Sequence, residues 1–142
     1  MIKLMEYYKV PLTKTTIYEG LLGQVMMDIN VSSDKAEVTF EMSNGRTYKV
    51  FHEHELCEKV YIESMSGVLY GGFDNLLGTP LLLAESESGV YSTTEPDHKE
   101  KTGTTFTFTT IKGSVTICWV GIDCGTGNEV VGLFQDGVNL RA

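Results

Sequence analysis

The chain has 142 residues, of which 42% are hydrophobic and 21% charged, as is typical of one globular domain and not of a disordered chain. Its 19 acidic and 11 basic residues give a net charge of −8, which disfavours direct binding of nucleic acid. Three cysteines form no even disulfide framework, and neither a signal pattern nor a membrane-spanning apolar run is visible. We therefore expect a single cytoplasmic domain over residues 1–142, with no membrane partner.

The N-terminal residues predict an arm followed by a strand. Residues 1–14 alternate poorly and could form an arm, a short strand or an oligomer contact, and residues 15–19 resemble a helical turn. Residues 24–31 predict a half-buried strand in which Met26 breaks the alternation. The apolar residues expected on one face of this strand are Val25, Met27, Ile29 and Val31.

The next segment predicts a β-hairpin. Residues 36–42 alternate between apolar and polar side chains, as expected of a strand with one buried face. Asn44-Gly45 is a strong turn sequence, because both residues tolerate a positive φ. Residues 47–52 then form the returning strand, with Tyr48 and Val50 on its buried face.

The middle of the chain is less regular. Residues 59–63 predict a strand, and residues 64–78 a glycine-rich loop with a short helix near residues 73–77. The leucine-rich residues 80–85 indicate a buried strand, plausible at the centre of a sheet. Residues 86–103 are polar and predict a long loop, which in a compact domain is usually mobile or functional.

A second hairpin is expected over residues 104–120, with its turn at Lys112-Gly113 and with Val115, Ile117 and Trp119 on one face. A last strand is expected over residues 128–135. The count is about seven strands and one or two short helices. The fold class is therefore mainly β: a twisted antiparallel sheet, a sandwich or an open barrel.

The end of the first hairpin is the best place to look for a site. His52, His54 and Cys57 lie close together and can all bind a transition metal, although zinc would need a fourth ligand from elsewhere. Cys57 beside a histidine could instead be a nucleophile. In the structural alternative, His52 continues the face of Tyr48 and Val50, and Cys57 packs as a small apolar residue. We assign no catalytic residue and expect no cofactor, with zinc as the alternative.

Basic residues near the first hairpin are the candidates for binding a phosphate-containing ligand. They are Arg46, Lys49, His52 and Lys59, and Lys112 in the second hairpin adds a further cation. A site for a nucleotide would need several of them to converge on one pocket. A protein that blocks a protein partner would need only an exposed acidic or apolar patch.

Three segments, in order, resemble a family of small phage-encoded proteins of unknown function. They are GRTYKVFHE with a following CE (residues 45–58), LGTPLLLAE (residues 77–85) and TIKGSVTICW (residues 110–119), and the likeness covers about residues 44–134. Members of this family usually have a cysteine where Leu56 stands and a glutamine where His54 stands. A paired-cysteine ligand role therefore does not transfer to this chain.

The resemblance implies a phage origin and no characterised reaction. Small phage proteins that are not parts of the virion often neutralise host components. We therefore expect a non-enzymatic binding protein in the cytoplasm of the infected cell, which antagonises a host process or defence system. It would either sequester a nucleotide-like signal or block a host protein. The alternatives are a metal- or cysteine-dependent enzyme centred on His52, His54 and Cys57, and an assembly protein that oligomerises through residues 1–14.

Overall fold

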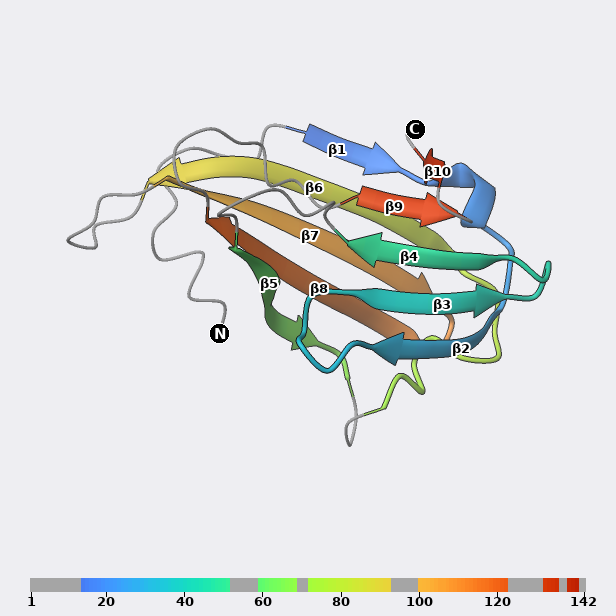
Figure 1. The fold of residues 1–142 in the computed structure, drawn as a ribbon. Helices are drawn as coiled ribbons and strands as arrows, with labels where there is room; N and C mark the ends of the chain where they lie inside the picture. The colour runs from blue at the N-terminus through green and yellow to red at the C-terminus, as the bar shows by residue number, and fades with distance from the viewer. Residues whose placement is uncertain are drawn as a thin grey trace.

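The computed structural model describes residues 14–51, 59–68, 72–92, 100–122, 132–135 and 138–140. Within these residues it contains ten strands and one short 3-10 helix (Figure 1). In chain order they are β1 (Lys14–Ile17), η2 (Glu19–Leu21), β2 (Met26–Val31), β3 (Val38–Met42), β4 (Thr47–Phe51), β5 (Lys59–Ser66), β6 (Leu83–Ser92), β7 (Glu100–Thr110), β8 (Gly113–Ile122), β9 (Gly132–Gln135) and β10 (Val138–Leu140).

The strands form two five-stranded sheets that pack face to face as a sandwich (Figure 1). One sheet has the order β1-β6-β7-β8-β5 and the other the order β10-β9-β4-β3-β2, and every pair of neighbouring strands is antiparallel. Neither sheet closes on itself. The predicted mainly-β class is confirmed. The seven strands β2–β8 have five or more residues each, and β1, β9 and β10 are shorter.

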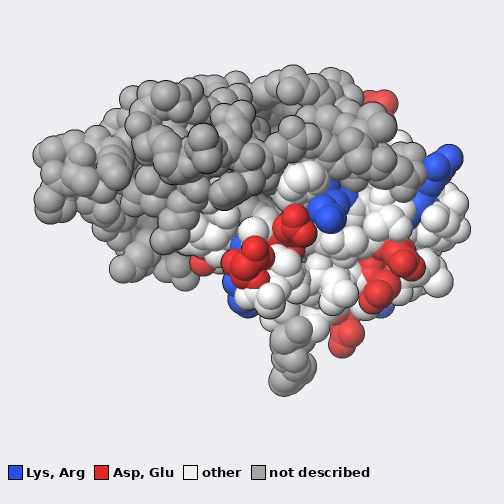
Figure 2. Space-filling model, in the orientation of Figure 1, with Lys and Arg blue, Asp and Glu red and all other residues white. Residues whose placement is uncertain are grey.

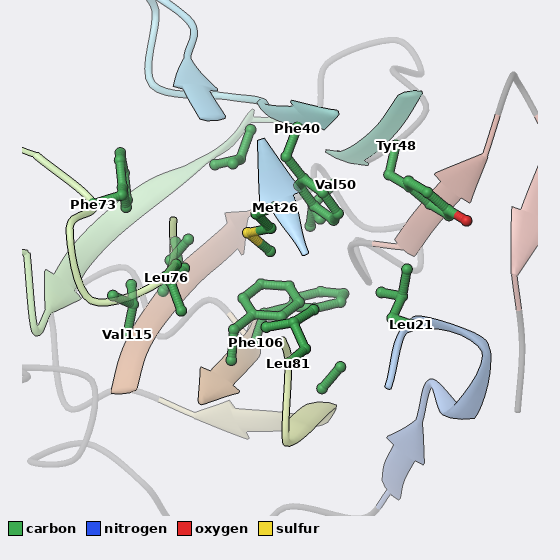
Figure 3. Close-up of a cluster of buried hydrophobic side chains, with 14 of the residues drawn as sticks. Leu21, Met26, Phe40, Tyr48, Val50, Phe73, Leu76, Leu81, Phe106 and Val115 are labelled. Carbon is green, nitrogen blue, oxygen red and sulfur yellow. The ribbon is translucent and has the colours of Figure 1, made fainter. Parts of the chain in front are cut away.

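The core lies between the two sheets. Phe40 of β3 meets Phe108 of β7 edge to face, with 5.7 Å between the ring centroids. Figure 3 shows side chains from both sheets, among them Phe40 and Phe106, pointing into this common interior. The predicted buried faces of both hairpins are confirmed, although Cys118 and Val120 on the other face of β8 are buried as well. The buried residues of the two hairpins are Val38, Phe40, Met42, Tyr48, Val50, Phe106, Phe108, Val115, Ile117 and Trp119.

Strand β2 corrects the predicted alternation of residues 24–31. Met26 is fully buried, whereas Met27 is 62% exposed. The cause is a β-bulge: Met26 lies opposite Met42 and Asp28 lies opposite Glu41, so Met27 is an extra residue without a partner in β3. A bulge of this kind shifts the alternation by one residue. Period-two counting across it therefore assigned the two methionines to the wrong faces.

The first hairpin forms where it was predicted, but its turn has a different geometry. The loop is Ser43–Gly45, and the N–H of Gly45 donates to the carbonyl of Met42 at 2.9 Å. Gly45 has φ +83°, and Asn44 is not among the described residues with a positive φ. This is the three-residue hairpin loop in which only the last residue is left-handed.

The region between β5 and β6 holds no helix in its described residues. Near the predicted helix at residues 73–77, the N–H groups of Leu76 and Leu77 both donate to the carbonyl of Phe73, which makes one turn only. Residues 15–19, predicted as a helical turn, lie in the end of β1 and the start of η2. The leucine run 80–85 is also not one buried strand, because β6 begins at Leu83 and Leu82 is exposed.

The predicted long loop over residues 86–103 is mostly strand. Strand β6 continues to Ser92 and β7 begins at Glu100, with a continuous register from Leu83–Thr109 to Ser92–Glu100. Only residues 93–99 lie outside the described residues. Serine and threonine are compatible with strands, and Thr is enriched in them. Polarity predicted neither the secondary structure of this segment nor its burial, because Ser86 and Thr102 are buried.

The ends of the chain follow the predictions in part. The expected arm over residues 1–14 lies outside the described residues, except for Lys14, which begins β1. Of the predicted strand 128–135, Gly132–Gln135 forms β9, and Val138–Leu140 adds a further short strand, β10. In the described part of the chain, no helix is long and apolar enough to cross a membrane.

The turn between β2 and β3 ties the two sheets together. The carbonyl of Lys35 accepts a hydrogen bond of 2.7 Å from the N–H of Ile62 in β5. The carbonyl of Ala36 accepts one of 3.1 Å from Nε1 of Trp119 in β8. Both donors belong to the opposite sheet. A turn that satisfies backbone and side-chain donors across the sandwich fixes the position of β3 over β5 and β8.

Asp34 stabilises this turn as a carboxylate. Its Oδ1 accepts hydrogen bonds from the hydroxyl of Ser32 at 2.6 Å and from the N–H of Ala36 at 3.1 Å. These two bonds, the one from Ser32 first, hold the pKa of Asp34 below its ordinary value of 3.8. A carboxyl whose pKa is lowered by folding stabilises the protein above its unfolded-state pKa, and this contribution disappears as pH falls through the folded-state pKa.

We therefore expect Asp34→Asn to lower the free energy of unfolding at about pH 7, with the difference from the wild type shrinking toward about pH 2. Urea unfolding at a series of pH values measures this difference. Ser33→Ala, at the adjacent exposed position, is the control and should show no such pH dependence. A difference that stays constant with pH would contradict the role given to the charge.

Candidate functional surface

The His-Cys segment predicted as a site lies outside the described residues. This applies to His52, His54 and Cys57 alike, so the zinc and thiol hypotheses stay predictions. The flanking strands are described: β4 ends at Phe51 and β5 begins at Lys59, both at the same end of the sandwich (Figure 1). Among the residues that the structure does describe, no group of three or more His, Cys, Asp or Glu side chains could hold a metal ion.

The predicted phosphate-binding cations are not gathered at one place. Arg46 follows the β3–β4 turn at one end of the sandwich, and Lys59 begins β5 in the other sheet at the opposite end (Figure 1). Lys49 lies between them on the outer face of β4, where its Nζ is 3.6 Å from a carboxylate oxygen of Glu37. The same Nζ is 5.6 Å from the ring centroid of Phe51.

Lys112 is part of a junction between the β7–β8 turn and the segment that precedes β6. Its Nζ donates to the carbonyl of Leu77. Close by, the hydroxyl of Thr110 donates to the carbonyl of Asn75, and Nδ2 of Asn75 donates to the carbonyl of Gly67 at 2.9 Å. The ammonium of Lys112 therefore donates to a backbone carbonyl. Side-chain donors often do so in turns, where the carbonyl has no backbone N–H partner from a sheet or helix.

A different surface stands out at the hairpin end of the sandwich, by which we mean the end that holds the β3–β4 and β7–β8 turns. Leu22, Leu82 and Ile111 are 40%, 57% and 76% exposed there. We call these three residues the apolar end. Single exposed apolar residues are normal, but a contiguous group of large ones marks an interaction surface more often than chance.

Backbone hydrogen bonds bring the three residues of the apolar end together. The N–H of Gly23 donates to the carbonyl of Leu81 at 2.8 Å, so these two segments are neighbours. Leu22 precedes Gly23 and Leu82 follows Leu81, and both therefore lie next to this hydrogen bond. The N–H of Leu82 donates to the carbonyl of Thr109 at 2.7 Å, two residues before Ile111. Leu82 thus lies between the other two.

Two more large apolar residues are exposed toward the same end. Ile17, at the end of β1, is 46% exposed, and Met27, in the β2 bulge, is exposed as described above. With the apolar end, they are the exposed large hydrophobic residues among the side chains whose exposure the structure describes.

Sequence patterns did not identify the apolar end. The leucine run over residues 80–85 predicts a buried strand, and Leu82 belongs to it. One signal was present in Ile111. The register pairs Thr110 with Gly113, so the β7–β8 loop consists of Ile111 and Lys112. Two-residue hairpin loops favour Asn, Gly and Asp, and a β-branched apolar residue there serves neither the turn nor the core.

These observations describe a mainly-β sandwich with an apolar surface at one end. The chain belongs to the family described as Domain of unknown function (DUF7448), whose model matches residues 19–128. The matched residues run from η2 to beyond β8, and they include all three residues of the apolar end. No curated protein and no solved structure matches the chain.

Proposed function

We propose that the chain is a small non-enzymatic binding protein of phage origin that antagonises a host process by blocking a protein partner. The observation that supports this function is the exposure of Leu22, Leu82 and Ile111 side by side. Large apolar side chains cost free energy in water, about 25 cal/mol for each Å² left exposed. A partner that covers them recovers this free energy, which makes such a group a natural centre for a protein interface.

The placement of the cations favours a protein partner over a nucleotide signal. A phosphate-binding pocket needs donors that converge on one anion. Arg46 and Lys59 lie at opposite ends of the sandwich, and Lys49 and Lys112 contact Glu37 and the carbonyl of Leu77. We propose that the protein acts in the cytoplasm of the infected cell. We also propose that it binds its partner without a cofactor.

The test compares the wild type with a variant that carries Leu22→Ser, Leu82→Ser and Ile111→Ser. Both proteins, tagged, are used to capture partners from host extract, and any captured protein is then purified and titrated against each. Because the three positions are exposed, the variant should fold normally. We expect its affinity to be about a hundredfold lower, since a few central apolar residues usually dominate an interface.

The control is Thr39→Ala on the outer face of β3, which should bind like the wild type. A captured protein that binds the triple variant as tightly as the wild type would overturn the proposal. So would a wild type that retains only a small molecule, detected by mass spectrometry after denaturation of the captured sample.

A further inference from the structure

We infer that the partner presents an apolar centre surrounded by lysine or arginine side chains, and this inference rests on the proposed function. Two carboxylates lie close to the apolar end. The carbonyl of Glu19 accepts a hydrogen bond from the N–H of Leu22, so Glu19 precedes it by one helical turn. Asp74 adjoins Asn75, whose carbonyl accepts from Thr110, the residue before Ile111. Both carboxylate residues are exposed.

A second acidic group lies beside Met27. Asp28 is directly opposite Glu41 in the register of β2 and β3, and both are exposed on the outer face of their sheet. Figure 2 shows acidic side chains gathered over this face. Like charges directly opposite each other on a sheet are destabilising. A cationic side chain of a partner, placed near this pair, would reduce the repulsion.

Among the residues that the structure describes, the cations at the hairpin end do not balance these carboxylates. Lys112 donates to the carbonyl of Leu77, and Arg46 follows the β3–β4 turn. Against these two cations stand Glu19, Asp28, Glu41 and Asp74, and also Glu85, which lies opposite Ile17 in the register. The local excess has the same sign as the net charge of −8.

This charge distribution favours a basic protein over a second copy of the chain as the partner that covers the apolar end. A second copy of the chain would bring another acidic rim against the first, and like-charge contacts across an interface oppose association. A basic surface is attracted from a distance and associates faster at low ionic strength. The apolar end with its acidic rim therefore fits a partner of opposite charge, with an apolar centre to cover Leu22, Leu82 and Ile111.

The experiment uses two labelled peptides with the same apolar centre, Leu-Trp-Leu, flanked on both sides by three lysines or by three glutamates. Fluorescence anisotropy measures their binding to the full chain. We expect the lysine peptide to bind at least about tenfold more tightly in about 50 mM salt, with an advantage that shrinks in about 500 mM salt because the charges are screened. Glu19→Gln with Asp74→Asn should weaken only the lysine peptide, and the Leu22, Leu82 and Ile111 triple variant should weaken it further.

Each outcome bears on one of the two proposals. Equal binding of the two peptides, or no binding of the lysine peptide, would overturn the inferred partner chemistry. The proposed function would still stand if the captured host protein continued to depend on the apolar end. Light scattering provides a third result: a dimer that the triple variant abolishes would assign the surface to a second copy and also overturn the inference.

Discussion

Gly67→Ala is expected to lower the free energy of unfolding by more than about 3 kcal/mol, well above the roughly 1 kcal/mol of an average substitution. A Cβ at this position would lie 2.0 Å from the carbonyl oxygen of Ser114, and 3.2 Å from the Cα of Val115. These are backbone atoms of β8, so no side-chain rotation can relieve the overlap. Strand β5 would have to move away from β8, and the bond from Nδ2 of Asn75 to the carbonyl of Gly67 would be disturbed.

Gly45→Ala is the matched control for this prediction. Gly45 and Gly67 have nearly the same φ, +83° and +85°, in the left-handed region. Nothing lies within 4 Å of a Cβ built on Gly45. Its substitution should therefore cost only the left-handed strain, about 1–2 kcal/mol. Urea unfolding of both variants separates the two contributions, and equal losses would show that the contact with Ser114 is unimportant.

The fold class could be predicted because apolar residues alternate where each strand has one buried face. Val38, Phe40 and Met42 show this in β3, and Phe106 and Phe108 in β7. Two local features break the same pattern. The bulge at Met27 shifts the alternation within one strand, and the bend at Leu82 exposes one leucine of a continuous run. Both depend on how neighbouring segments pair, which alternation alone does not encode.

The candidate surface was harder to predict than the fold. Leu22 and Leu82 are brought close together by the hydrogen bond between Gly23 and Leu81, which are far apart in the chain. Conversely, Lys59 is close to Arg46 and Lys49 in sequence but separated from them in space, because β4 and β5 belong to different sheets. The phosphate-binding site was predicted from proximity along the chain. It would form only if β4 and β5 were neighbours in one sheet.

The hairpin end and the β2–β3 turn have separate roles. The apolar end is made of exposed side chains, which can be replaced with little effect on the core. The β2–β3 turn holds the sheets in place through Lys35 and Ala36. Variants in the two regions should therefore be separable, with loss of binding in the first and loss of stability in the second. This separation is what allows the binding proposals to be tested without unfolding the protein.

Trp119→Phe is expected to lower the free energy of unfolding by about 2–3 kcal/mol. The side chain is 1% exposed, and its ring packs edge to face on Phe106 with 5.6 Å between centroids. Phenylalanine leaves a small cavity and removes the hydrogen bond to the carbonyl of Ala36. Losing a buried donor leaves its acceptor unsatisfied at a cost of about 1–3 kcal/mol, to which the cavity adds. Circular dichroism must follow the unfolding, because Trp119 is the one tryptophan of the chain.

Tyr48→Phe is the control, because the hydroxyl of Tyr48 accepts only a long hydrogen bond of 3.4 Å from Asn44 and its ring still stacks on Phe40. Its loss should not exceed about 1 kcal/mol. Hydrogen exchange gives a second, local measurement. The N–H of Ile62 donates to the carbonyl of Lys35, next to the residue that Trp119 contacts. If Trp119 holds the turn across the sandwich, this amide should exchange faster in Trp119→Phe than global destabilisation explains. Unchanged relative protection would show that the turn keeps its position without the indole.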